Sequence, residues 1–172
     1  MNVNIGMIQK LSSPNPFGLV SSQMENGETN LMAISWWTYV SNKPATLAIC
    51  LSKRGYTGEL IKKSREFALN IVDESIKEAA FQCGTCSGRS VNKAAKFNIA
   101  LEEAKLISTK LVKAHKIALE CRVVQCLEVS DHDLFVAEIL EASLNPEKNQ
   151  VFAVNGYSSL STLTIAAPSK GS

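Results

Sequence analysis

Two cations, three hydroxyl side chains and a glycine lie together in residues 52–57 (SKRGYT), between an apolar segment and a short amphipathic one. An arginine can hold a phosphate through two charged hydrogen bonds, and a lysine adds a point charge. A helix beginning here would add free backbone N–H groups and a partial positive charge. Gly55 would let the backbone approach the ligand closely. The segment therefore predicts phosphate binding, and the alternative is that Thr57 is simply a helix N-cap.

A second loop of small and polar residues, residues 83–93 (CGTCSGRSVNK), contains Ser87, Gly88, Arg89 and Lys93. This loop and residues 52–57 flank the same expected strand. We therefore expect the two loops to converge on one ligand.

A third segment, residues 29–41 (TNLMAISWWTYVS), is apolar but is interrupted by Asn30, Ser35 and Thr38. Polar groups on an apolar wall suit a planar, amphipathic ligand, and the adjacent Trp36 would add an aromatic face. A tryptophan pair is also common in protein cores, so this segment alone does not decide between the two interpretations.

The composition is that of an ordinary globular protein. The chain has 172 residues, 45% hydrophobic and 20% charged, with a net charge of +2. This charge is too small for a dedicated nucleic-acid-binding protein. No apolar run approaches the roughly 20 residues of a membrane helix, and the N-terminus does not resemble a signal peptide. We therefore expect a cytoplasmic protein with neither a membrane nor a nucleic-acid partner.

Hairpin-connected strands dominate the pattern of apolar residues. Asn26-Gly27 predicts a type I′ turn, and residues 131–133 predict the turn of a long hairpin. Helices are expected from about Thr57, over 74–84 and over 90–97, with a long connection over 98–116 and a frayed tail over 167–172. The expected strands are 17–23, 29–41, 45–52, 66–73, 116–129, 134–143 and 150–157. This order favours a mainly β, closed antiparallel barrel with helical excursions over a doubly wound sheet.

Cysteine and histidine chemistry is less specific in this sequence. The odd number of five cysteines predicts reduced thiols. Cys83 and Cys86 form a C-x-x-C, which fits a redox dithiol, half a zinc site or small packing residues in a tight loop. We favour packing and expect no metal site, because no second ligand pair is present. His115 and His132 are expected at the surface.

Three segments in this order, GETNLMAISWW, SKRGYT and CGTCSGRSVNK, resemble the flavin reductase-like family of FMN-binding split barrels, with the flavoredoxin branch most similar. The resemblance covers about residues 15–97 and continues more weakly through the last hairpin. It implies one flavin reductase-like domain over residues 1–172, with the fold of a six-stranded Greek-key split β-barrel. It also implies a homodimer with one FMN per subunit near the dimer interface.

The resemblance assigns roles to individual side chains. The phosphate would be held by Ser52, Arg54 and Thr57, with Lys53 and Tyr56 nearby. The ring and ribityl chain would be lined by Asn30, Met32, Ala33, Ser35, Trp36 and Thr38, and the site closed by Ser87, Gly88 and Lys93.

The function implied by the resemblance is that of a flavoprotein oxidoreductase. Electrons would pass from NADH, NADPH or another donor, which includes a protein donor, through FMN to an acceptor. No side chain needs to act as an acid or base, because the flavin performs the electron transfer. The alternatives are an FMN-containing electron carrier, an FMN store or sensor, and a barrel whose loops bind another phosphate.

Overall fold

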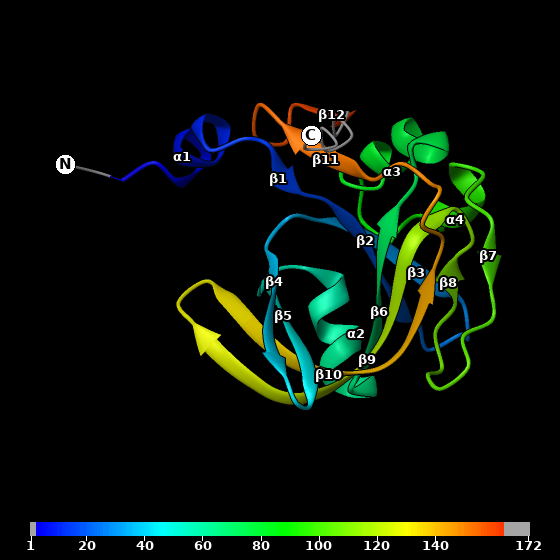
Figure 1. Ribbon diagram of the computed structural model, residues 1–172. Helices are drawn as coiled ribbons and strands as arrows, with labels where there is room; N and C mark the ends of the chain where they lie inside the picture. The colour runs from blue at the N-terminus through cyan, green and yellow to red at the C-terminus, as the bar shows by residue number, and fades with distance from the viewer. Residues whose placement is uncertain (1–2, 164–172) are drawn as a thin grey trace, which may run out of the picture.

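The computed structural model describes residues 3–163, in which strands predominate (Figure 1). Seven strands form an antiparallel sheet in the order β3-β2-β6-β9-β10-β5-β4. Their bounds are β2 Gly18–Gln23, β3 Thr29–Ile34, β4 Trp37–Asn42, β5 Ala45–Ser52, β6 Glu66–Val72, β9 His115–Val129 and β10 His132–Leu144. The predicted antiparallel architecture with helical insertions is confirmed, while the tail predicted over 167–172 lies outside the described residues.

The segment predicted as one strand, residues 29–41, is divided in the structure. β3 pairs with β2, and β4 pairs with β5, so the two halves lie at opposite ends of the sheet. The chain crosses from one end to the other through Ser35 and Trp36, between the two strands. Each half thereby forms a hairpin with its own neighbour in sequence. The division gives the sheet seven strands, where the resemblance implied a six-stranded barrel.

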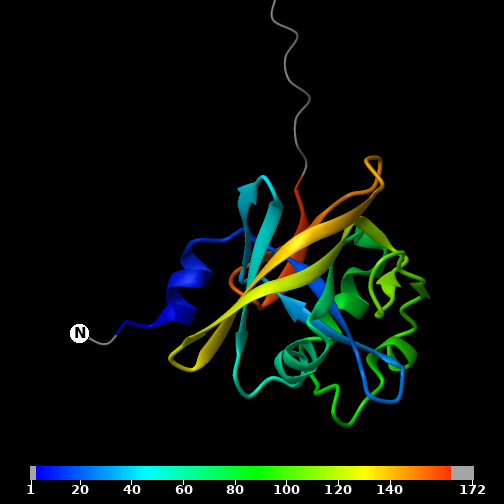
Figure 2. The same ribbon diagram turned by 90° about the horizontal axis from the view of Figure 1, so that it is seen from below.

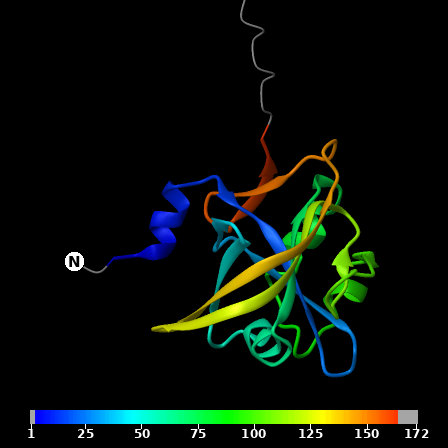
Figure 3. The same ribbon diagram turned by 60° about the horizontal axis from the view of Figure 1, so that its bottom comes forward.

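The long hairpin of β9 and β10 is the scaffold of the sheet, as predicted. It crosses the molecule in Figures 2 and 3, where it runs from yellow to orange. β9 pairs with β6 on one side, and β10 pairs with β5 on the other. The core under these strands contains fully buried side chains that include Leu47, Ile49, Phe67, Leu69 and Phe135. Burial of this kind stabilises the fold by about 1.5–3 kcal/mol for each large apolar side chain.

A small second sheet has the order β1-β11-β12. Its strands are β1 Asn15–Pro16, β11 Val151–Val154 and β12 Ser159–Thr162. The strand predicted over 150–157 therefore ends early. Asn155 and Gly156 have positive φ values of 54° and 68°, which turn the chain. This turn brings Tyr157 back toward the large sheet.

The other Asn-Gly pair behaves differently from the prediction. Only Gly27 has a positive φ, of 82°, whereas a type I′ turn needs positive values at both central residues. The Gly27 N–H donates to the Met24 carbonyl at 3.0 Å, and the Met24 N–H donates to the Glu28 carbonyl at 2.8 Å. The β2–β3 connection is therefore a longer loop than predicted.

Helices occupy the connections between strands. The predicted helices appear as α2 Tyr56–Ser64, as η1 Glu74–Ile76 with α3 Lys77–Gln82, and as α4 Lys93–Lys96. The connection over 98–116 includes a short hairpin of β7 Leu101–Glu102 and β8 Leu111–Val112, and α1 Ile5–Leu11 was not predicted. None of the helices in residues 3–163 has the length and apolarity needed to cross a bilayer.

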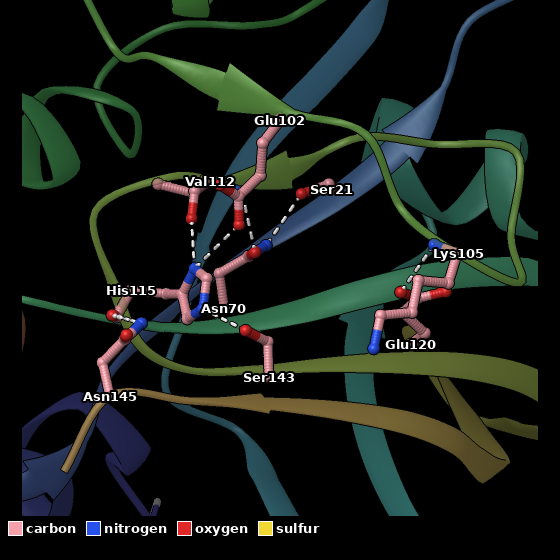
Figure 4. A network of polar contacts seen from close by, with 9 residues as sticks. All are labelled: Ser21, Asn70, Glu102, Lys105, Val112, His115, Glu120, Ser143 and Asn145. Carbon is pink, nitrogen blue, oxygen red and sulfur yellow. Dashed lines mark hydrogen bonds and ion pairs between the residues drawn. The ribbon is translucent and has the colours of Figure 1, made fainter.

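Polar side chains connect β2, β6, β8, β9 and β10 through buried hydrogen bonds (Figure 4). Asn70 donates to Ser21 Oγ at 2.7 Å and accepts from the Val112 N–H at 2.9 Å. His115, which was expected at the surface, is only 2% exposed. Its ring nitrogens lie 2.7 Å from the Val112 carbonyl and 2.9 Å from Ser143 Oγ. Hydrogen bonds to both nitrogens make this burial possible.

Candidate flavin site

The segment over residues 52–57, for which the sequence predicts phosphate binding, lies where β5 ends and α2 begins. Gly55 is the N-cap of α2, and a glycine has no side chain with which to cap the first-turn N–H groups. Thr57 is inside the helix and 3% exposed, so the alternative in which Thr57 is the N-cap is wrong. An uncapped helix start with buried polar neighbours is suited to an anion.

A hydrogen-bonded pair fixes the Thr57 hydroxyl. The Asn30 side-chain amide donates to Ser22 Oγ at 3.1 Å and to Thr57 Oγ1 at 2.9 Å. Both amide hydrogens are thereby used. Since Thr57 accepts this bond, its own hydroxyl hydrogen stays available as a donor.

The loop over residues 83–93 meets this pair, as predicted. A Cβ on Gly88 would lie 1.9 Å from Asn30 Oδ1, so only a glycine allows this approach. The next residue, Arg89, forms an ion pair with Glu59 of α2. Its guanidinium carbon lies 4.8 Å from the centre of the Tyr56 ring. The two loops are therefore in contact around the start of α2.

The two cations of the segment differ in their partners. Lys53 Nζ lies 2.9 Å from a carboxylate oxygen of Glu128 at the end of β9. Among residues 3–163, Arg54 forms no ion pair, and its backbone N–H donates to Ser52 Oγ at 3.4 Å. Arg54 is therefore the freer cation for a ligand.

A cavity of about 240 Å³ lies beside this segment. Its lining residues are Met32, Ala33, Ile34, Trp36, Cys50, Leu51, Ser52, His132 and Tyr157. We call this space the ring cavity. The predicted residues Met32, Ala33, Trp36 and Ser52 are among its lining residues, whereas His132 and Tyr157 were not predicted.

His132 stacks on Trp36, with ring centres 4.9 Å apart and planes inclined by 28°. The side chain is 24% exposed, so the surface position expected for His132 is confirmed in part, and its ring also forms part of the cavity wall. His132 Nδ1 lies 2.9 Å from Asp131, and this hydrogen bond lowers the pKa of the Asp131 carboxyl. His132 is placed opposite Ser52 by the pairing of β10 with β5, which the local sequence does not reveal.

Two titratable side chains of the ring cavity, Cys50 and Tyr157, are held neutral. Burial raises the pKa of the Cys50 thiol, and the carboxylates of Asp131 and Asp133 raise it further. Partial burial also raises the pKa of Tyr157, although contacts with Ser35 and Gln9 act in the opposite direction. Both side chains are therefore protonated at neutral pH.

Four predicted residues lie both outside the wall of the ring cavity and outside the contacts around the start of α2. Ser35 is buried at the crossover, Thr38 is exposed on the edge strand β4, and Ser87 is exposed. Lys93 is 4% exposed, and its Nζ donates to the Cys83 carbonyl at 2.6 Å. Burial lowers the pKa of Lys93. Direct contacts from these four side chains to a ligand remain predictions.

The C-x-x-C pair fits packing better than redox chemistry. Cys83 is fully buried in an apolar cluster, and burial raises its pKa to about 12. Only a thiolate is an effective nucleophile, so this thiol is inert at neutral pH. Within residues 3–163, no group of three His, Cys, Asp or Glu residues could hold a metal ion.

The sequence matches the flavin reductase like domain family over residues 11–161. The chain belongs to this family. An uncharacterised protein of Archaeoglobus fulgidus is 34% identical over 66% of this chain and 64% of its own length. The reductase component of a 4-nitrophenol 4-monooxygenase/4-nitrocatechol 2-monooxygenase of Rhodococcus opacus is 32% identical over 63% and 55%. The match thus spans less than two thirds of each relative.

Solved structures of the family have the same fold. A flavoredoxin of Methanosarcina acetivorans superposes with a TM-score of 0.81 and 24% identity, and the match covers 99% of this chain and 94% of that one. The predicted flavin reductase-like split barrel is confirmed by this likeness and by the match over residues 11–161.

The side chains and backbone groups of the site match the chemical groups of a flavin mononucleotide. The start of α2 offers backbone N–H groups, the Thr57 hydroxyl and the Arg54 guanidinium, which are all donors for a phosphate. The adjoining wall is largely apolar, and it includes the Trp36–His132 stack. These two environments lie next to each other because Ser52 belongs to both.

Proposed function

We propose that this protein is a cytoplasmic flavoprotein oxidoreductase, one domain over residues 1–172, that binds FMN. It would take electrons from NADH, NADPH or another donor and pass them to an acceptor. The observation that carries the proposal is the uncapped start of α2 beside a largely apolar cavity. The Rhodococcus opacus relative is named as a reductase component, which supports the same class of chemistry.

The phosphate of FMN would be bound by donors of three kinds. Arg54 would give charged hydrogen bonds, Ser52 and Thr57 would give hydroxyl donors, and α2 would give backbone N–H groups. Asn30 and Gly88 do not need to touch the phosphate. They fix Thr57 and bring the second loop against it.

The ring of FMN would lie against the apolar part of the cavity. Met32, Ala33 and Leu51 would exclude water from it, and the Trp36–His132 stack would fix its plane. Bound FMN supplies hydride and electron transfer. The chain's own contribution is to bind the flavin, orient it and exclude water.

The homodimer implied by the resemblance is also part of the proposal. α1 stands apart from the sheet in Figures 1, 2 and 3, and it contains no buried residue. The exposed apolar residues of α1 are Ile5, Met7, Ile8 and Leu11, and Val3 lies just before the helix. Each of these side chains is 49–77% exposed. Apolar residues gathered in this way mark interaction surfaces. A second copy of the chain would remove them from water.

The first test is whether the protein keeps FMN after desalting, which its visible absorption spectrum shows. The second is the FMN dissociation constant of the native protein compared with that of single variants. Arg54→Ala should weaken binding by roughly ten-fold to a hundred-fold, because hydrogen bonds to charged groups contribute about 1.5–3 kcal/mol. Thr57→Val should also weaken binding, since it removes the hydroxyl.

Matched variants make this test specific. Thr57→Ser keeps the hydroxyl and should keep most of the affinity. Arg122→Ala removes an exposed arginine of β9 that pairs with Glu66 and should leave FMN binding unchanged. Equal affinity of the native protein, Arg54→Ala and Thr57→Val would overturn the phosphate assignment. If the protein bound FMN tightly but did not oxidise NADH or NADPH, the hypothesis of an enzyme would give way to that of an electron carrier.

A further inference from the structure

A second cavity, of about 370 Å³, lies at the open end of the β9–β10 hairpin, whereas His132 lies beside the turn of that hairpin. Its volume falls within the range of about 300–1,000 Å³ that is usual for small-molecule sites. Of the described residues, none lines both this cavity and the ring cavity. We call it the lysine cavity. Its wall includes Lys116, Lys148, Asn149, Gln150, Phe152 and Leu163.

Lys116 fixes the loop between β10 and β11, which forms one wall of the lysine cavity. Its Nζ donates to the Pro146 carbonyl at 2.8 Å and also to the Lys148 carbonyl. The Lys116 carbonyl accepts from the Asn145 N–H at 2.8 Å, and the Asn145 side chain donates to the His115 carbonyl at 3.0 Å (Figure 4). The loop is therefore ordered before any ligand binds, which lowers the entropy cost of binding.

Neither lysine of this cavity is neutralised by a carboxylate. Among residues 3–163, no ion pair includes Lys116 or Lys148. Two carboxylates reach the same loop, but Asp73 and Glu74 accept from Asn149, at 3.2 Å and 2.8 Å. Two of the three Lys116 ammonium hydrogens are bonded to carbonyls, which leaves one for a ligand. The cavity therefore has two positive charges that an anion would neutralise.

The remainder of the wall combines apolar and amide side chains. Phe152 of β11 is half-buried and offers an aromatic ring, and Leu163 is 47% exposed. Gln150 adds an amide group that can donate or accept a hydrogen bond. An inorganic anion would use the lysines but would leave the apolar side chains in water. The wall therefore suits an anionic group that is attached to a flat apolar body.

We propose that the lysine cavity binds an aromatic anion, which is a ring that carries a carboxylate or a phosphate. The anionic group would lie between Lys116 and Lys148, and the ring would lie against Phe152 and Leu163. A lysine acts as a point charge and lacks the rigid fork of an arginine, so both kinds of anionic group fit. The inference goes beyond the proposed function, because the cavity is separate from the flavin site.

The test is calorimetric titration of the full-length protein, with FMN present in excess so that the flavin site is filled. The probes are 2-naphthoate and 2-naphthyl phosphate, which share a ring and differ in the anionic group. At least one of them should bind. The neutral 2-naphthamide has the same ring as 2-naphthoate, and it should bind about ten-fold more weakly than the better anion, because it lacks the charge.

Two variants locate the bound probe. Lys148→Met keeps an apolar stem but removes a charge, and it should raise the dissociation constant of the better anion by about three- to ten-fold. Only the backbone of Lys148 takes part in the hydrogen bonds of the described loop, so this variant should leave the loop intact. Phe152→Leu should raise the same constant by about two- to ten-fold, because it removes the aromatic ring.

Matched controls separate the site from general effects. Lys113→Met removes an exposed lysine between β8 and β9 and should leave binding of the anions unchanged. Lys148→Arg keeps the charge and should keep most of the affinity. The FMN dissociation constant should be the same in the native protein and in Lys148→Met, since Lys148 does not line the ring cavity.

Three results would overturn the inference and leave the flavin proposal in place. The first is that neither anion binds. The second is equal affinity for 2-naphthoate, 2-naphthyl phosphate and 2-naphthamide, which would show that charge has no part in binding. The third is anion binding that neither Lys148→Met nor Phe152→Leu weakens, which would place the probe elsewhere. Binding of only one anion would support the inference and identify the anionic group.

Discussion

Gly88 shows how one residue can hold the site together. Its missing side chain allows the loop over residues 83–93 to touch Asn30, which in turn fixes Thr57. Asn30 cannot easily move away, because both hydrogens of its amide are bonded. The glycine is therefore required by packing rather than by backbone conformation.

We predict that Gly88→Ala destabilises the protein and weakens FMN binding. The added Cβ would lie 1.9 Å from Asn30 Oδ1, and overpacking of this kind costs about 1–3 kcal/mol. Urea unfolding and the FMN dissociation constant would measure the two effects. Gly84→Ala in the same loop is the matched control, because its Cβ would have neighbours no closer than 3.4 Å. Equal behaviour of the two variants would contradict this account.

Individual site residues were predictable only where a local motif contains them. Met32, Ala33, Trp36 and Ser52 belong to two short motifs, and the structure places all four in the ring cavity. His132 and Tyr157 reach the same cavity through strand pairing and through the turn after β11. The same limit explains why His115 was expected at the surface, since its partners Val112 and Ser143 are set by tertiary contacts.

Among the elements, α2 has the most direct effect on the site, because its first turn offers the donors for a phosphate. The helix is tied to β10 by Lys62, whose Nζ lies 2.7 Å from Asp133 Oδ2. The Asp133 side chain is 3% exposed, so this carboxylate depends on its cation.

We predict that Asp133→Asn lowers the free energy of unfolding by about 1–3 kcal/mol, because a buried charged hydrogen bond is lost. The FMN dissociation constant should rise in parallel as α2 loosens. Glu25→Gln is the control, since Glu25 pairs with the adjacent Lys63 while both side chains are exposed. It should leave the urea midpoint unchanged. A similar shift in both variants would show that the position of α2 does not depend on Asp133.

The positions of the strands in the sequence were predicted well, but their pairing in the sheet was predicted poorly. The segment over 29–41 has continuous strand character, so nothing local marks the crossover at Ser35 and Trp36. The two Asn-Gly pairs show the same limit. Asn26-Gly27 was expected to form a type I′ turn and does not, whereas Asn155-Gly156 was expected to continue a strand and has both residues at positive φ.

At the scale of the whole molecule, α1 presents exposed apolar residues that the proposed homodimer would cover. We predict that the protein sediments as a dimer and that the double variant Ile8→Glu with Leu11→Glu sediments as a monomer. Charged side chains at these positions would oppose burial against a second copy. Analytical ultracentrifugation over a range of concentrations would measure the change.

A matched double variant tests whether charge alone causes dissociation. Val124 and Val129 are also exposed, at 55% and 52%, but they belong to β9 and not to α1. Val124→Glu with Val129→Glu should remain dimeric. A native protein that sediments as a monomer at every concentration would remove the homodimer from the proposal.

The crossover between β3 and β4 has a consequence for biosynthesis. Residues that line the ring cavity extend from Met32 to Tyr157, and the strands next to the crossover lie at opposite ends of the sheet. A nascent chain would lack part of the cavity wall until His132 and Tyr157 had left the ribosome. The flavin of the proposed function would therefore find its complete cavity only after these residues have folded, and its colour would report that this part of the fold has formed.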